Sequence, residues 1–135
     1  MAISLVKQYS VFLTNEPGVL KNFAELFVNE KVDILAISED VRYDAAIMRL
    51  AVAYDTDISH ILTQAGFTSV KTDAICLDTP NRVGLVRDIG AVMAKVNVNI
   101  TTIYGTGSGA YSRWVLVVNN ITRALNALES CGLFD

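Results

Sequence analysis

The sequence predicts an α+β fold made of two similar units, each with the order strand, helix, strand, strand, helix. Three observations lead to this prediction: an internal repeat, alternating apolar and polar residues in some segments, and a helical spacing of apolar residues in others. The 135 residues suffice for one ordinary domain or two very small ones. With 52% apolar and 19% charged residues, the chain can bury a core and is not a disordered tail.

The repeat aligns the chain with itself at an offset of 66 positions, without insertion or deletion. Identical residues fall at matching turns and strands, among them Asn15 and Asn81, Gly18 and Gly84, Ile34 and Ile100, Leu50 and Leu116, and Gly66 and Gly132. The repeat divides the chain into units at residues 1–72 and 73–135. Residues 1–6 align with residues 67–72, so we expect them to supply the fourth strand of the second unit. Two long strands, Ile3 to Leu13 and Ser69 to Thr79, then each serve both units.

In the first unit, Tyr9, Val11 and Leu13 alternate with polar residues, as in a strand with one buried face. A turn follows, and then a helix whose apolar residues recur at the 3.6-residue period: Val19, Leu20, Phe23, Leu26 and Phe27. The remaining elements are strands at 32–38 and 46–54, a polar connection at 40–44, and a short helix that begins after 55–57 and ends at Gly66.

The second unit repeats this order. Its first helix carries the apolar residues Leu85, Val86, Ile89, Val92, Met93 and Val96. Strands are expected at 98–104 and 113–119, joined by a flexible glycine-rich connection at 105–109, and Thr122 is expected to cap a last helix that ends at Gly132. The order corresponds to two ferredoxin-like βαββαβ units with antiparallel sheets and helices on one face.

The strand at residues 113–118 is apolar on both faces, although helices can cover only one face of such a sheet. The other face is therefore expected to meet a second sheet, most simply that of a second copy. This pattern favours a homodimer.

The most informative polar residues lie where the first strand of each unit turns into its helix. The N-terminus of a helix exposes unpaired N–H groups with a partial positive charge, which suits a carboxylate. We expect a ligand to be bound there by Asn15, Glu16, Pro17, Gly18, Val19 and Leu20 in the first unit, and by Asn81, Arg82, Val83, Gly84, Leu85 and Val86 in the second. Asp33 and Asn99, which open the second strands, are expected near the same end of the sheet. The alternative is that each asparagine is only a helix cap and Pro-Gly only a turn.

These residues resemble the ACT domain family, in tandem over nearly the whole chain. The resemblance rests on a strand, the motif Asn-x-Pro-Gly-x-Leu at residues 15–20, an amphipathic helix, and Val-x-Ile opening the next strand. It implies βαββαβ units, binding of a small-molecule amino acid, and control of an enzyme of amino-acid metabolism. The second unit keeps both asparagines, as in serine-binding members, but has Val83 where proline is usual. The first unit keeps Pro-Gly but has Asp33, so the two sites are not expected to share one ligand.

Composition argues against other classes of protein. The net charge of −3 disfavours nucleic acid as a partner, and no apolar run is long enough to cross a membrane. No signal peptide is expected from the N-terminal residues, and Cys76 and Cys131 are expected as thiols in a reducing cytoplasm. No nucleophile–base set is present, so no catalytic residue, metal or cofactor is expected. Two alternatives stay open: an assembly module with degenerate ligand sites, and an RNA-binding ferredoxin-like domain.

Overall fold

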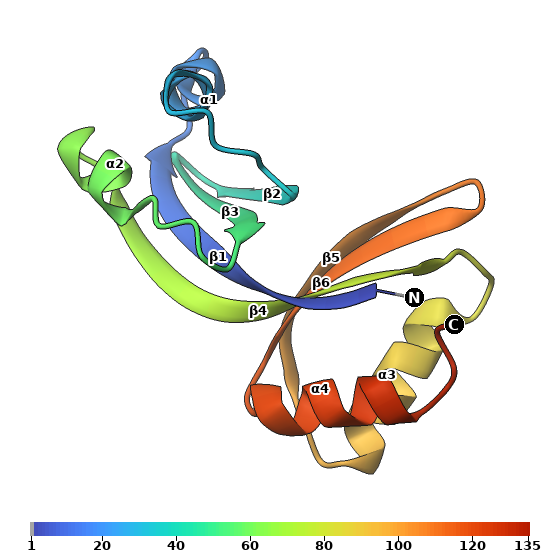
Figure 1. Cartoon of the computed structure of the whole chain (residues 1–135). Helices are drawn as coiled ribbons and strands as arrows, with labels where there is room; N and C mark the ends of the chain where they lie inside the picture. Colours follow the sequence, from blue (N-terminus) through green and yellow to red (C-terminus); the bar gives the residue numbers. More distant parts are fainter. Residues whose placement is uncertain (1) are drawn as a thin grey trace. The chain divides into compact units, whose positions relative to one another are not determined.

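The computed structural model describes residues 2–135, which divide into two compact units (Figure 1). The N-terminal unit is Val6–Thr72, and the C-terminal unit combines Asp73–Asp135 with residues 2–5. The divisions fall inside two strands of 13 residues each, β1 (Ala2–Thr14) and β4 (Thr68–Pro80). These are the long strands that the repeat offset predicts.

The N-terminal unit places two helices on one face of an antiparallel sheet. Its elements after β1 are α1 (Val19–Asn29), β2 (Ala36–Arg42), β3 (Ala45–Ala53), α2 (Ser59–Gln64) and the start of β4, and the strand order is β2-β3-β1-β4. The core packs helix residues Phe23, Phe27 and Leu62 against strand residues Tyr9 and Leu50. Apolar residues at period two on the strands and 3.6 on the helix make this face.

The C-terminal unit repeats the arrangement with α3 (Leu85–Lys95), β5 (Ile100–Ser108), β6 (Tyr111–Val118) and α4 (Ile121–Ser130) in the strand order β1-β4-β6-β5. Residues 2–5 of β1 stand where the start of β4 stands in the N-terminal unit, and Ile3 packs on the core together with Phe134. The predicted α+β fold of two ferredoxin-like units is confirmed. Within residues 2–135, no helix has the length and apolar content needed to cross a membrane.

The repeat extends to the backbone. Among the described residues, every one with a positive φ has its counterpart 66 positions away, and the pairs are Gly18 and Gly84, Lys31 and Asn97, Tyr43 and Gly109, and Gly66 and Gly132. An L-residue rarely adopts this conformation, so Lys31 and Tyr43 hold it because the turn geometry of the shared fold requires it.

Four predicted details are wrong. β2 begins at Ala36 rather than Val32. The connections expected at 40–44 and 105–109 are mostly strand, because hairpin pairing continues to Arg42 with Ala45 and to Ser108 with Tyr111. Asn120, not Thr122, caps α4, since its side chain accepts the N–H of Arg123 at 3.1 Å.

Truncation of Ile3 to alanine should destabilise the C-terminal unit by about 1–2 kcal/mol, because a half-buried apolar side chain is lost from that core alone. Residue-resolved amide hydrogen exchange measures the effect. Val70→Ala, an exposed change in β4, is the control and should leave both units unaltered. Loss of protection confined to Val6–Thr72 after the Ile3 change would contradict the assignment of residues 2–5.

Candidate functional site

The candidate site of each unit is the junction between its first strand and first helix, β1–α1 or β4–α3. An asparagine fastens each junction to the neighbouring hairpin turn. The Asn15 N–H donates to the Asp44 carbonyl at 2.8 Å and its side-chain amide donates to the Tyr43 carbonyl at 3.1 Å. Asn81 makes the matching bonds to Ala110 at 2.9 Å and Gly109 at 3.2 Å. These asparagines hold the loop in place and do not cap the helix.

Both helices begin without a side-chain cap among residues 2–135. The N-cap residues are Gly18 (φ 85°) and Gly84 (φ 88°), and the first helical hydrogen bonds run from Asn22 to Gly18 and from Asp88 to Gly84. The N–H groups of the preceding two residues in each helix therefore have no intrahelical acceptor. Together with the helix dipole, they form a local environment that favours an anion.

An apolar side chain stands exposed beside each set of free N–H groups. Leu20 and Val86 are equivalent in the repeat, and each is 50% exposed. Both belong to the predicted apolar stripe of their helix and to the predicted site residues, and neither is buried in the core of its unit. Of the other predicted site residues, Leu85 is buried, Val19 and Gly84 are half-buried, and the rest of the two loops is exposed: Asn15, Glu16, Pro17, Gly18, Asn81, Arg82 and Val83.

The junction of the C-terminal unit is partly occupied by its own charged side chains. Arg82 Nη1 lies 2.6 Å from the Asp88 carboxylate, and Arg82 Nη2 donates to the Leu133 carbonyl at 3.1 Å. The hydrogen bond from Arg82 is the largest cause of the lowered pKa of Asp88. In the N-terminal unit the equivalent residues are Glu16 and Asn22, which are exposed, so the two junctions differ in charge and in openness.

The predicted proximity of Asp33 and Asn99 to the loop of their own unit is wrong. Asn99 precedes β5 and lies beside Asn119, whose side chain accepts its N–H at 2.9 Å, whereas Asn81 contacts the turn after Ser108. The length of β5 separates the two ends by roughly 26 Å, since each strand residue advances about 3.3 Å. Asp33 likewise precedes β2, at the end opposite Tyr43.

Gly107 of β5 lies at the C-terminal junction and Gly105 lies beside Trp114 of β6, although the sequence had suggested only a flexible connection. A Cβ on Gly107 would lie 2.8 Å from the Asn81 side chain, and one on Gly105 would lie 2.4 Å from the Trp114 ring. Both glycines therefore make room for larger side chains, and the spacing Gly-x-Gly within a strand is the sequence signal for this. The Trp114 indole N–H is buried without an acceptor within residues 2–135.

The family model for an ACT domain pair matches residues 4–130. This chain belongs to the ACT domain family. The ACT domain pair is a regulatory module, and the match covers both units. No curated protein matches the sequence.

Solved structures share the fold of this ACT domain pair at low sequence identity. Protein BT0572 from Bacteroides thetaiotaomicron has a TM-score of 0.81 and 21% identity, with 94% of this chain and 88% of that chain covered. The ligand-free regulatory subunit of aspartate kinase from Thermus thermophilus has a TM-score of 0.73 and 13% identity, with 97% and 95% covered. The corresponding subunit from Thermus flavus has a TM-score of 0.66 and 15% identity, with 96% and 95% covered.

The Arg82–Asp88 pair should make stability depend on pH. The pKa of Asp88 is lower in the folded protein than its unfolded value of about 3.9. The ionised Asp88 therefore contributes fully to the free energy of unfolding above the unfolded pKa, and this contribution is lost as the pH falls through the lower folded pKa. Arg82→Gln should therefore destabilise the protein at pH 7, and the difference from wild type should shrink below about pH 4. Urea unfolding at several pH values measures this.

The matched control is Arg87→Gln, because Arg87 is mostly exposed and its contact with Asp88 is longer, at 3.3 Å. It should change stability less than Arg82→Gln at every pH. A difference for Arg82→Gln that stays constant from pH 7 to pH 2.5 would show that Asp88 is not its partner.

Proposed function

We propose that this ACT domain pair binds a free amino acid at its loop–helix junctions and thereby controls an enzyme of amino-acid metabolism. The observation that carries the proposal is the uncapped helix start, repeated in both units, with free N–H groups beside an exposed apolar side chain. The N–H groups fit a carboxylate, and Leu20 or Val86 fits the apolar part of a ligand. The fold shared with aspartate kinase regulatory subunits supports a regulatory role.

The ammonium group of such a ligand needs an acceptor. Glu16 supplies a carboxylate in the loop of the N-terminal unit. Asp33 and Asn99 lie at the far end of the sheet from the loop of their own unit, so they do not supply this acceptor there. We infer that a homodimer brings them to a junction of the partner copy. Phe12 is exposed on the sheet face away from the helices, where it is paired in register with Ile47. An exposed apolar side chain on this face is consistent with such an assembly.

One observation favours an assembly module with degenerate sites as the second candidate. Arg82 already has an acceptor in Asp88 and in the Leu133 carbonyl, so the C-terminal junction is less open to a guest. If only the N-terminal junction binds an amino acid, the proposed function and a degenerate C-terminal site are compatible.

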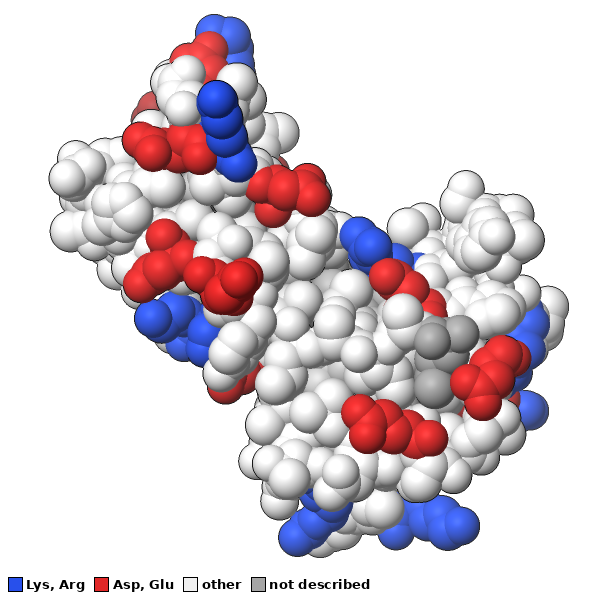
Figure 2. Space-filling model, in the orientation of Figure 1, with Lys and Arg blue, Asp and Glu red and all other residues white. Residues whose placement is uncertain are grey.

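RNA binding has less support. On the face shown in Figure 2, acidic and basic side chains are interspersed rather than gathered by sign. Arg113, on the third strand of the C-terminal unit, is tied to the Asp78 carboxylate by bonds of 2.7 and 3.0 Å. Its charge is therefore compensated within the protein.

A thermal-shift screen of the twenty amino acids tests the proposed function. A ligand at 100 times its Kd should stabilise the fold by ~2.7 kcal/mol, which is a readily measured shift. No shift with any amino acid would favour the assembly module instead, and salt-dependent retention of RNA would favour the RNA-binding domain.

Matched truncations show which junction binds. Leu20→Ala or Val86→Ala should weaken binding by roughly fivefold at the unit that holds the ligand, because apolar contact area is lost from an exposed side chain. Val28→Ala is the control, because Val28 is also exposed on α1 but lies near its other end. If Leu20→Ala and Val86→Ala both bind with the wild-type affinity, the ligand binds elsewhere.

A further inference from the structure

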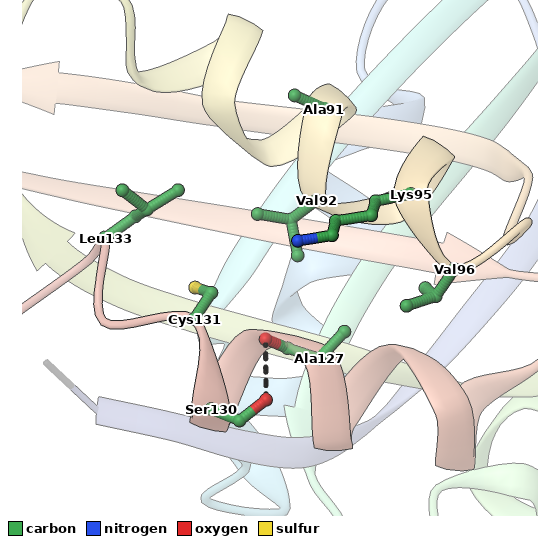
Figure 3. A pocket seen from close by; sticks show the side chains of 8 residues that line it. All are labelled: Ala91, Val92, Lys95, Val96, Ala127, Ser130, Cys131 and Leu133. Atoms are coloured by element: carbon green, nitrogen blue, oxygen red, sulfur yellow. Dashed lines mark hydrogen bonds between the residues drawn. The ribbon is translucent and has the colours of Figure 1, made fainter.

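A hollow of about 490 Å³ lies between α3 and α4 (Figure 3). Val92, Val96 and Ala127 give it an apolar lining, and Leu133 lies at its margin. Lys95 extends along the opening, and the Cys131 thiol lines the same space. Its volume falls in the range of small-molecule sites, and a single cation beside an apolar surface gives it a defined chemistry.

The N-terminal unit carries a smaller hollow at the equivalent place, about 250 Å³ between α1 and α2. Each residue that lines it lies 66 positions before a residue that lines the larger hollow. All six aligned lining residues differ, and three of the differences alter size or charge most. Ile61 corresponds to Ala127, Asn29 to Lys95 and Glu30 to Val96. The C-terminal hollow is therefore larger, has lost an acid and has gained a cation, on the same backbone.

Among the described residues, no acidic residue lines this hollow to compensate its positive charge. Within residues 2–135, Lys95 makes no hydrogen bond or ion pair, and none of the residues lining the hollow is acidic. Arg123 donates to the Val96 carbonyl at 3.3 Å, which places a second cation, a guanidinium, near the same end. This local charge is opposite in sign to the net charge of −3 of the chain.

We propose that the hollow between α3 and α4 binds a short aliphatic carboxylate that lacks an amino group. The carboxylate pairs with the Lys95 ammonium, and the hydrocarbon lies on Val92 and Ala127. An α-amino acid fits poorly, because its ammonium would meet a like charge and an apolar wall without an acceptor. This inference is independent of the amino-acid site at the junctions.

Three probes with one carbon skeleton test the proposal: 4-methylpentanoate, L-leucine and 4-methylpentan-1-ol. Each is titrated into the full-length ¹⁵N-labelled chain, and amide shifts are followed. We expect 4-methylpentanoate to shift Ala91, Lys95 and Ala127 with an affinity about tenfold above that of either other probe. The hollow of the N-terminal unit is the internal control, and Leu26 and Ile61 should not move. Leucine bound at a junction would shift Leu20 or Val86 instead, so the two sites are distinguishable.

Two variants take residues that the N-terminal unit already carries at these positions. Lys95→Asn should reduce the preference for the carboxylate over the alcohol to near one, and Lys95→Arg should retain it. Ala127→Ile should abolish binding of both by filling the space. The proposal is overturned if 4-methylpentanoate shifts the amides of both hollows equally. It is also overturned if 4-methylpentanoate binds Lys95→Asn as tightly as it binds the wild type. Thermal unfolding measures whether each variant is folded. If Ala127→Ile does not fold, the Lys95 variants alone test the proposal.

Discussion

The side-chain amide of one asparagine in each unit is the interaction on which the candidate sites depend. Asn15 and Asn81 tie the loop after the first strand to the turn of the neighbouring hairpin, through the carbonyls of Tyr43 and Gly109. The asparagine is thereby engaged away from the helix, and a left-handed glycine takes the N-cap position. The N–H groups of two residues in the first turn of each helix therefore have no intrahelical acceptor, because the asparagine side chain that could have capped the helix bonds to the hairpin turn instead.

Duplication has kept the backbone of the two units and changed their charges. The positive-φ positions match throughout, whereas Glu16 stands opposite Arg82 and Asn22 opposite Asp88. The Arg82–Asp88 pair closes part of one junction, while the other stays open. The hollows between the helices diverge in the same way. The two units thus present different charges on a common backbone.

Much of the fold could be predicted because local patterns determine it. The 66-residue offset indicated the two units and their long strands. The apolar periodicity indicated the helices, since it follows directly from burial on one face. The site was less predictable. Asp33 and Asn99 were placed at the wrong end because the direction of an edge strand depends on pairing across the sheet. Leu20 and Val86 fit the helical stripe as well as their buried neighbours do, and only the three-dimensional structure shows that they are half exposed. The role of Gly105 depends on Trp114, which belongs to the neighbouring strand β6. The role of Gly107 depends on Asn81, which is distant in sequence.

The central claim is that an uncapped helix start binds the carboxylate of an amino acid. It is tested most directly by the backbone amide resonances of residues 19–22 and 85–88, recorded with the amino acid that stabilises the protein and with its carboxamide. We predict large shifts at Leu20 and Lys21, or at Val86 and Arg87, with the amino acid, and binding at least tenfold weaker with the carboxamide, which lacks the negative charge. Equal binding of the two compounds, or shifts confined to amides remote from both helix starts, would contradict the account.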